Sequence, residues 1–477
     1  MSSLPRLSAH ALLGTVLDEG SFESWDEPID TRHHPEEYRE SLRRAAERAG
    51  TDESVITGRG LVHGRPVAVI VNEFAFLAGS IGAAAAARIT DAVARATAER
   101  LPLVASTCSG GTRMQEGTPA FVHMARISRA IVAHQEAGLP YLVHLRHPTT
   151  GGVLASWGSL GHITVAEPGA MVAFLGPKVY EALEGRPFPP GVQVSDNLVR
   201  RGVIDAVVPT TDLAAVLDRT LGLLLDPPTA ATRQERPGPA ERRRSSWESI
   251  EITREDHRVG VRDVLRHGSD SIIRLQGTDE GENDRTVMIA IARIDGMPCV
   301  LIGQDRSRQS PSSPMGPAAL REARRGMHLA NQLRLPLVSV IDTPGAELSP
   351  EAEEGAMAGE IARCIAGMTS LTVPSVSVLL GQGCGGGALA LLPADRTIAA
   401  ENAWLSPLPP EGASVIMFGD AGRAPQMVEA QRVSAFELLA DGIVTHLVRE
   451  AEGESPEAFA DAVAASIGAR LRELRRP

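Results

Sequence analysis

Short apolar runs alternate with longer stretches of helical patterning along most of the chain. The runs tend to open at or just after a proline, and they have the length and composition of buried strands. In the first half they are VAVIV (67–71), PLVAS (102–106), YLVHL (141–145) and ITVAE (163–167), and helical stretches occupy 82–100 and 118–137. Because strands that alternate with helices form βαβ units, the pattern predicts an α/β fold around a mostly parallel, buried sheet.

The same order of segments occurs twice in the chain. RLPLV stands at 100–104 and again at 334–338, and GGVLA at 151–155 corresponds to GGALA at 386–390, an offset of 235 residues. Three prolines repeat at offsets of 232, 234 and 234 residues: Pro66 with Pro298, Pro102 with Pro336, and Pro140 with Pro374. This regular order predicts two copies of one domain.

The repeat places one domain in residues 1–227 and the other in residues 248–477. The segment 228–247 between them is rich in proline, arginine and serine and has no apolar periodicity, so it is predicted to be a linker. The 477 residues, 43% of them hydrophobic, are enough to give each domain a substantial core.

The amino-acid composition excludes several classes of binding partner for this protein. The net charge of −12 argues against nucleic acid and against anionic membranes, and no apolar run reaches the length of a membrane span. The N-terminus lacks the basic and apolar regions of a signal peptide. Four widely spaced cysteines form neither a disulfide framework nor a CxxC zinc pattern. We therefore expect a cytoplasmic protein without a structural metal.

GQGCGGGALA (381–390) contains a G-x-G-x-x-G pattern, with Glu401 twenty residues after Gly381, and so mimics a dinucleotide-binding loop. Two observations argue against that interpretation. Only nine residues separate Gly387 from the next predicted strand at 397–400, too few for a full crossover helix. The other copy has PTTGGVLAS (148–156) at the same place, so the two copies share only Gly-Gly and a small apolar residue at a predicted strand-to-helix turn.

Two glycines that open a short helix leave main-chain N–H groups unpaired, and no side chain prevents an oxygen from approaching them. The helix dipole adds partial positive charge. We therefore predict that Gly151 and Gly152 in one copy, and Gly386 and Gly387 in the other, form oxyanion holes. The alternative is a tight turn that serves only close packing.

Two polar segments follow matching strands, where α/β sheets bind ligands. They are TCSGGTRMQEG (107–117) and IDTPGAELSPEAEEG (341–355). Arg113 is a candidate for binding phosphate or carboxylate, with a surface ion pair as the alternative. Cys108 and Cys384 lack a recognisable histidine partner and are poor candidates for nucleophiles. Glu401 is expected to end a strand and to face solvent or a neighbour.

At these segments the chain resembles the carboxyltransferase component of acetyl-CoA carboxylase, from about residue 12 to residue 450. The first copy is similar to the bacterial beta subunit and the second to the alpha subunit. The matching segments are SGGTRMQEG (109–117), PTTGGVLAS (148–156), AEPGAMVAFLGPKV (166–179), IDTPGA (341–346), GGGALAL (385–391) and AENAWLSPLPPEGAS (400–414). The chain departs from the family in lacking a four-cysteine zinc ribbon, in Ala78 where glycine is usual, and at Glu347 and Leu348.

The resemblance implies a beta–alpha fusion of two homologous crotonase-like domains in tandem, each a ββα superhelix. It implies transfer of a carboxyl group from carboxybiotin to a short acyl-CoA, with acetyl-CoA to malonyl-CoA, as in fatty acid biosynthesis, as the first candidate. Gly151 and Gly152 would hold the thioester oxygen, and Gly386 and Gly387 the ureido oxygen. The implied substrate-binding residues are Ser109, Gly110, Gly111, Arg113, Gly345, Ala346 and Ala388. The site would form between unlike domains, usually of different protomers, so a homo-oligomer is expected.

Lys178 is the only lysine, and its surroundings, LGPKVYE, do not resemble a biotin attachment site. No ATP-binding loop is found. The resemblance therefore implies partnership with a separate biotin carboxyl carrier protein and a separate biotin carboxylase, and no zinc. Three alternatives stay open: a decarboxylase component that runs the same site backwards, a biotin-independent decarboxylase of malonyl thioesters, and a non-catalytic scaffold or acyl-CoA-binding homologue.

Overall fold

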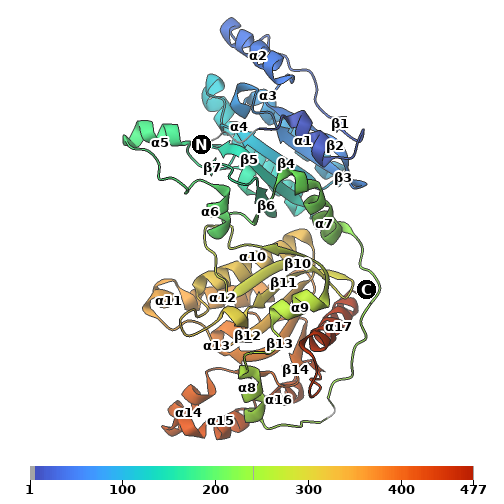
Figure 1. The fold of residues 1–477 in the computed structure, drawn as a ribbon, viewed down its shortest axis with the longest axis vertical. Coiled ribbons are helices and arrows are strands. Elements are labelled where there is room, and N and C mark those ends of the chain that lie inside the picture. The colour runs from blue at the N-terminus through green and yellow to red at the C-terminus, as the bar shows by residue number, and fades with distance from the viewer. Residues whose placement is uncertain (1–5, 240, 476–477) are drawn as a thin grey trace. The chain divides into compact units, whose positions relative to one another are not determined.

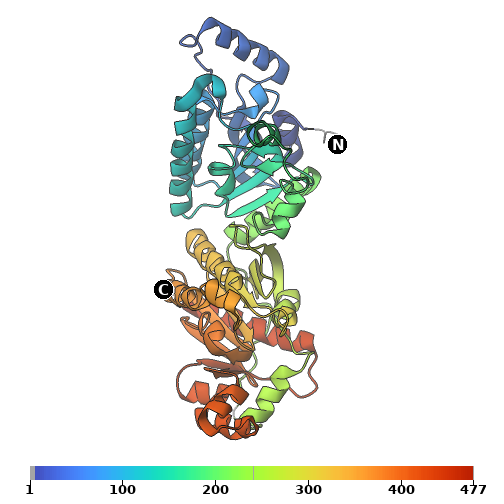
Figure 2. The same cartoon turned by 90° about the vertical axis from the view of Figure 1, so that its left-hand side faces the viewer.

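A computed structural model describes residues 6–239 and 241–475, which divide into two compact units. Unit 1 holds the described residues up to 222 together with 279–281, and unit 2 holds those of 223–278 and from 282 onward. Each unit consists of a sheet with helices packed on it (Figures 1 and 2). Two α/β domains in tandem agree with the prediction from the sequence repeat.

The sheet of unit 1 has the strand order β1-β2-β3-β4-β5-β6-β8, and β7 pairs with β5. The strands from β3 to β8 are parallel, whereas β1, β2 and β3 pair antiparallel. Their bounds are β1 Glu23–Ser24, β2 Val55–Val62, β3 Arg65–Asn72, β4 Leu103–Ser109, β5 Tyr141–Thr150, β6 Ile163–Ala166, β7 Val172–Ala173 and β8 Ala206–Val207.

The helical stretches predicted at 82–100 and 118–137 are confirmed as α3 and α4. The α-helices of unit 1 are α1 Ala9–Val16, α2 Glu36–Ala49, α3 Ala83–Ala98, α4 Gly117–Glu136, α5 Pro177–Glu184, α6 Ser195–Arg200 and α7 Leu213–Leu225, the last of which ends just inside unit 2. Short 3₁₀ turns are η1 Leu77–Gly79, η2 Met114–Glu116, η3 Trp157–Ser159 and η4 Thr210–Asp212.

Unit 2 repeats the topology of unit 1. Its sheet has the order β16-β14-β13-β12-β11-β10-β9, with β15 on β13, and again only the strands at one edge pair antiparallel. The strands are β9 Ser269–Leu275, β10 Val287–Ile294, β11 Met297–Gln304, β12 Leu337–Thr343, β13 Ser375–Cys384, β14 Arg396–Ala400, β15 Trp404–Ser406 and β16 His446–Val448.

The α-helices of unit 2 are α8 Ser246–Arg254, α9 Val261–Gly268, α10 Pro317–Leu333, α11 Pro350–Glu354, α12 Met357–Thr369, α13 Gly385–Leu389, α14 Pro410–Phe418, α15 Ala424–Gln431, α16 Ala435–Ala440 and α17 Pro456–Leu474, with 3₁₀ turns η5 Arg306–Arg308 and η6 Ala421–Arg423. Within residues 6–239 and 241–475, no helix is long and apolar enough to cross a membrane.

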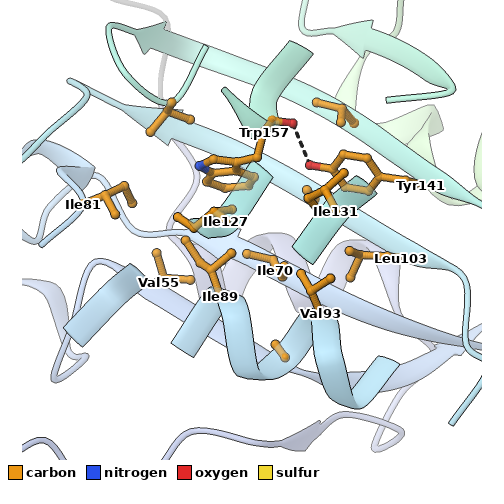
Figure 3. Packing of buried hydrophobic residues seen from close by; sticks show 14 of the residues in the cluster. Val55, Ile70, Ile81, Ile89, Val93, Leu103, Ile127, Ile131, Tyr141 and Trp157 are labelled. Atoms are coloured by element: carbon orange, nitrogen blue, oxygen red, sulfur yellow. Dashed lines mark hydrogen bonds between the residues drawn. The ribbon is translucent and has the colours of Figure 1, made fainter. Parts of the chain in front are cut away.

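The core of unit 1 lies between its sheet and the helices α3 and α4 (Figure 3). Burial of each large aliphatic or aromatic side chain contributes roughly 1.5–3 kcal/mol. Tyr141 also satisfies its hydroxyl, which donates to the carbonyl oxygen of Trp157 at 2.8 Å. The labelled residues of this cluster come from both layers: Val55, Ile70, Ile81, Ile89, Val93, Leu103, Ile127, Ile131, Tyr141 and Trp157.

Each unit has an antiparallel hairpin, β2–β3 or β10–β11, that the expectation of a mostly parallel sheet did not include. The turns are His63-Gly64 and Asp295-Gly296, in which both residues have positive φ: 47° and 80°, then 46° and 80°. That geometry matches the right-handed twist of antiparallel strands. Asp-Gly is a recognised hairpin signal, so the second hairpin was predictable from the sequence.

The segment predicted to be a linker packs along unit 2. The N–H groups of Thr232 and Arg233 donate to Asp295 Oδ1 at 2.8 and 2.9 Å. The Arg233 guanidinium forms ion pairs with Asp270 at 3.0 Å and Asp461 at 2.9 Å. These contacts attach the first part of the segment 228–247 to the β10–β11 turn, which explains why it groups with unit 2.

Candidate functional site

In unit 1 the loop after β4 lies directly against the turn after β5. The Ser109 hydroxyl donates to the carbonyl oxygen of Gly79 at 2.6 Å and accepts the N–H of Gly111 at 3.0 Å. Gly111 has a φ of +104°, and a Cβ there would lie 3.2 Å from both Gly151 Cα and Gly152 N. Glycine at 111 thus permits two main chains to meet, and the predicted site residues of this unit gather at the carboxyl ends of β4 and β5.

The two glycines of this turn do not offer equivalent donors. The N–H of Gly151 is bonded to the carbonyl oxygens of Ala173 at 3.2 Å and Phe174 at 3.1 Å, so it is not free. Within the described part of the chain, the N–H of Gly152 has no acceptor. The carbonyl oxygen of Gly152 is held by the hydroxyl of Ser156 at 2.5 Å. Gly152 therefore supplies the available donor, and the prediction of two donors is corrected here.

The turn after β5 is also not the predicted short helix. Residues 151–156 form consecutive turns and lead into η3. Gly151 has a φ of +63°, and its carbonyl oxygen accepts the N–H of Ala155 at 3.0 Å, which closes a single turn. A single turn adds little helix dipole, so the donor strength of Gly152 depends mainly on main-chain geometry.

A second free donor lies in η1, at a residue that stood out in the sequence only as a departure from the family. Leu77, Ala78 and Gly79 have φ values of 44°, 56° and 66°, three left-handed residues in succession. The carbonyl oxygen of Ala78 accepts the N–H of Gly110 at 2.9 Å, whereas the N–H of Ala78 has no acceptor among the described residues. Strained main chain of this kind often marks functional positions. Ala78 and Gly152 thus flank the Gly110-Gly111 loop as candidate donors.

Arg113 lies in a buried ion-pair network, so the alternative of a surface ion pair is wrong and its guanidinium is not exposed to a phosphate or carboxylate. The residue is 1% exposed. Its guanidinium pairs through both terminal nitrogens with the Glu53 carboxylate, contacts Glu116 at 3.4 Å, and donates to the Ser80 carbonyl oxygen at 2.7 Å. Burial lowers the pKa of Arg113, but the bonds and charge of Glu53 outweigh it, so the pKa lies above its ordinary value and the side chain stays charged.

Glu116 extends this buried network to the start of α3. One carboxylate oxygen accepts the N–H of Ala83 at 2.6 Å, and the other accepts the hydroxyl of Tyr38 at 2.6 Å. A carboxylate at a helix N-terminus satisfies orphan donors and complements the dipole. The two parts of the segment TCSGGTRMQEG therefore have different roles. Ser109, Gly110 and Gly111 lie against the glycine turn, whereas Arg113 and Glu116 anchor α2 and α3.

In unit 2 the matching strand ends border a cavity of about 540 Å³. Of the predicted site residues, Gly345, Ala346 and Gly386 line it. Its other walls are mainly apolar, and include Leu348, Met357, Ile361 and Leu408. Volumes of 300–1,000 Å³ with apolar walls and a few polar groups are typical of small-molecule sites.

The glycine run Gly385–Gly387 forms the first turn of α13, so its N–H groups have no acceptor within the helix. Cys384 precedes this helix without a side-chain capping bond. Gly387 and Ala388 lie behind the cavity wall: a Cβ on Gly387 would come within 2.5 Å of Met315 Cε, and Ala388 is fully buried. Of the two predicted oxyanion-hole glycines of this unit, Gly386 lines the cavity and Gly387 does not.

Three further candidates are settled by burial. Burial raises the pKa of the Cys108 and Cys384 thiols to about 11 in each case, so neither supplies a thiolate at neutral pH. Glu401 follows the end of β14, is 4% exposed and accepts the N–H of Glu450 at 3.0 Å, so of the two expected surroundings it faces a neighbouring segment and not solvent. Among the described residues, no group of three histidine, cysteine or acidic side chains is placed to hold a metal ion.

Comparison with known proteins supports the sequence resemblance. A family model described as "Carboxyl transferase domain" matches residues 12–461. A Mycobacterium tuberculosis protein named "Probable biotin-dependent acyl-coenzyme A carboxylase beta3 subunit" is 52% identical over 475 residues, which cover 99% of this chain and 96% of that one. The "Acetyl-coenzyme A carboxylase carboxyl transferase subunits beta/alpha" of Saccharopolyspora erythraea is 36% identical, covering 98% of this chain and 86% of that one.

Among solved structures, the fold is similar to the transcarboxylase 12S hexamer with bound methylmalonyl-coenzyme A. The TM-score is 0.79, the sequence identity 20%, and the match covers 99% of this chain and 91% of that one. At this identity the match shows the fold alone: two sheet-containing domains in tandem, as in a crotonase-like carboxyltransferase. The fold class predicted from the sequence is thus confirmed.

The left-handed conformation of Ala78 gives a stability prediction. Replacement Ala78→Gly should raise the free energy of unfolding by roughly 0.5–1 kcal/mol, because glycine adopts positive φ without the Cβ penalty. The matched control is Ala87→Gly on the exposed face of α3, which should lower it by about 1 kcal/mol. Urea unfolding curves of the two variants and the wild type test this. A loss of stability in both variants would contradict the strain at Ala78.

The Arg113–Glu53 pair gives a second prediction. Replacement Glu53→Gln should destabilise the protein by about 3–5 kcal/mol, because it leaves the buried guanidinium with only the more distant Glu116 carboxylate, at 3.4 Å, as charge partner. Replacement Glu99→Gln, which removes a partner of the exposed Arg59, should leave the unfolding midpoint nearly unchanged. Thermal and urea unfolding measure both. If Arg113→Met instead weakened acyl-CoA binding at unchanged stability, the buried-anchor interpretation would be wrong.

Proposed function

Because the chain belongs to the carboxyl transferase domain family, we propose that it transfers a carboxyl group from carboxybiotin to the α-carbon of a short acyl-CoA. The observation that carries the proposal is the repeated arrangement at the carboxyl ends of equivalent strands. In each unit a glycine turn leaves main-chain donors unpaired beside the loop of the preceding strand. A reaction in which two oxygens gain negative charge needs two such sites.

The proposed chemistry assigns one oxygen to each unit. As the α-proton leaves the acyl-CoA, the thioester oxygen gains charge, and the Gly152 N–H, with that of Ala78, would stabilise it. As the carboxyl group leaves the ureido nitrogen of carboxybiotin, the ureido oxygen gains charge, and the first N–H groups of α13 at Gly386 and Gly387 would stabilise that one. The ureido nitrogen that loses the carboxyl group then takes the α-proton, so no side-chain base is required.

The other predicted binding residues divide between the two units. Ser109, Gly110 and Gly111 form the loop behind the thioester site, and Gly345 and Ala346 line the 540 Å³ cavity beside α13. That cavity suits a compact bicyclic ring with one polar edge, which is the shape of biotin. Ala388 stays part of the proposal only through its N–H in the first turns of α13, since its side chain is buried.

The identity of the acyl group on the CoA substrate is less well determined than the type of reaction. Acetyl-CoA is the first candidate, supported by relatives named acetyl-coenzyme A carboxylase, while the 52% identical relatives are named only for acyl-coenzyme A. Leu348, 94% exposed at the cavity rim, and Glu347 stand where the alpha subunit has an aromatic and a small residue. A comparison of acetyl-CoA with propionyl-CoA therefore belongs in the first assay.

The proposal requires partners. With Lys178 as the only lysine, outside any biotinylation motif, carboxybiotin would arrive on a separate carrier protein loaded by a separate biotin carboxylase.

A homo-oligomer is also proposed, since transcarboxylase 12S, which shares the fold, assembles as a hexamer. Apolar side chains stand exposed near both sites: Met114, Phe121 and Phe174 in unit 1, and Ile416 and Met417 on α14 in unit 2. Association would cover them.

Reconstitution tests the proposal. The purified chain should not consume ATP or bicarbonate alone, and it should form a carboxylated acyl-CoA when a biotin carboxylase and a biotinylated carrier protein are added. Radiolabelled bicarbonate and chromatography of the CoA esters measure the product. Decarboxylation of the carboxylated ester without net synthesis would favour a decarboxylase component. Tight acyl-CoA binding without either reaction would identify a non-catalytic homologue.

Removing a main-chain donor from unit 1 and removing one from unit 2 should have different effects on acetyl-CoA binding. Gly152→Pro and Gly386→Pro each remove one N–H and should lower the rate of carboxyl transfer by roughly 10²–10³-fold. Only Gly152→Pro should weaken acetyl-CoA binding, as measured by calorimetric titration of folded variants. A Cβ at 152, from proline or alanine, would lie 2.8 Å from Thr112 Oγ1, so Gly152→Ala, which keeps the N–H, is the control for that contact. The opposite pattern of acyl-CoA binding would reverse the assignment of the two units.

A further inference from the structure

Gln304, the last residue of β11, holds the glycine turn of unit 2 through its side-chain amide. It is fully buried. Its Nε2 donates to the carbonyl oxygen of Gly387 at 2.7 Å, and its Oε1 accepts the N–H of Asp342 at 3.1 Å. The amide orientation is fixed by these partners, because only the nitrogen can donate to a carbonyl and only the oxygen can accept an N–H.

The sequence repeat shows which part of this arrangement is general. Asn72 ends β3 at the position equivalent to Gln304, and its Oδ1 accepts the N–H of Cys108 at 3.4 Å, just as Gln304 accepts that of Asp342. Asn72 makes no bond to the glycine turn of its own unit. There the side-chain bond goes to the carbonyl oxygen of Gly152, which accepts the hydroxyl of Ser156. By strand register Gly152 corresponds to Gly386, so the two units anchor neighbouring carbonyls of the same turn with different side chains.

The geometry of the peptide bond gives this anchor a consequence for the donors. A peptide unit is planar and trans, so the N–H of Ala388 points away from the carbonyl oxygen of Gly387. Fixing that carbonyl fixes the direction of the Ala388 N–H, the donor that follows those of Gly386 and Gly387 in the first turn of α13. The run Gly385–Gly387 needs such an anchor, because glycine is conformationally permissive and a five-residue helix has few internal bonds.

Packing on the other side of Gly387 completes the anchor. A Cβ at 387 would lie 2.5 Å from Met315 Cε and 3.4 Å from the nitrogen of Ala346. Met315 and Ala346 form a parallel β-bridge, and the N–H of Glu347 donates to the Met315 carbonyl oxygen at 2.9 Å. Gly387 is thus pressed against a fixed bridge on one side and bonded to Gln304 on the other.

We propose that Gln304 is a positioning residue that sets the orientation of the α13 donors for the biotin side of carboxyl transfer. This inference rests on the proposed function. Gln304 does not line the 540 Å³ cavity and would act only through the Gly387–Ala388 peptide. Its loss should therefore impair the biotin side and leave acyl-CoA binding in unit 1 unchanged.

The first experiment measures the turn itself, without any activity. Hydrogen–deuterium exchange of peptides spanning 384–392 should be at least 10-fold faster in Gln304→Met than in the wild type. Peptides spanning 148–156 should exchange at the wild-type rate. The matched control is Gln135→Met on α4, which removes a buried amide that donates to the Leu160 carbonyl oxygen at 2.6 Å. It should leave exchange at 384–392 unchanged.

The second experiment measures the reaction with malonyl-CoA as carboxyl donor and free biotin as acceptor. The carboxyl group leaves the α-carbon and joins the ureido nitrogen, whose proton goes to the α-carbon. Gln304→Met should lower kcat/KM for biotin by roughly 10²-fold, the cost of a donor displaced by about 1 Å. The Kd for acetyl-CoA should stay within about two-fold of the wild type. Gln135→Met should keep the wild-type kcat/KM for biotin.

A variant of nearly identical shape adds a pH test. In Gln304→Glu a protonated carboxyl can donate to the Gly387 carbonyl oxygen as the amide does, whereas the carboxylate repels it. Activity relative to the wild type should therefore rise as pH falls through the pKa of the new side chain, which burial raises. The nearby titrating group is Asp342, whose pKa burial raises to about 6, and the charges facing it are Asp305, Arg306 and Arg258. The ratio to the wild type cancels the contribution of Asp342 common to both proteins.

The outcomes separate this inference from the proposed function. Unchanged exchange at 384–392 in Gln304→Met, or faster exchange with unchanged biotin kinetics, overturns the role of Gln304. An equal loss of transfer in Gln135→Met overturns it as well, because any buried amide would then serve. If the wild-type protein transfers no carboxyl group with any acyl-CoA, the proposed function is wrong, and the exchange data still decide whether Gln304 holds the turn.

Discussion

Close contact between two stretches of main chain is the constraint on which both candidate sites depend. In unit 1, a side chain at Gly111 would lie 3.2 Å from the nitrogen of Gly152. In unit 2, one at Gly387 would lie 3.4 Å from the nitrogen of Ala346. Parallel strands bring these loops together at the carboxyl ends of each sheet, and glycine lets the main chains approach closely. The same absence of side chains leaves N–H groups open to a ligand oxygen.

Glycine alone does not make such donors precise, so each unit adds a support of its own. Unit 1 holds the carbonyl oxygen of Gly152 with Ser156 and fixes the neighbouring loop through the strained residues 77–79. Unit 2 holds the carbonyl oxygen of Gly387 with Gln304. A strained main chain costs stability. The buried pair of Arg113 and Glu53 nearby carries a desolvation cost of its own.

The two copies have diverged in what surrounds the shared turn. Unit 1 places a charged, buried network behind its loop, which anchors α2 and α3. Unit 2 places an apolar cavity in front of its turn. This difference is consistent with the proposed division of labour, in which a charged CoA ester and a compact ring system bind at the two homologous sites.

The sequence by itself determined the duplication, the strands and helices near each site, and the glycine turns, because these follow from local periodicity and from repeated spacing. The Asp295-Gly296 dipeptide also predicted the turn of the β10–β11 hairpin. Tertiary structure decided the rest. Glu53 lies 60 residues from Arg113, so their pairing could not be read from spacing. The bond from the Gly151 N–H to the carbonyl oxygens of Ala173 and Phe174, and the positive φ of Ala78, depend on neighbouring strands. Donor availability is a property of contacts between distant segments, and no local pattern encodes it.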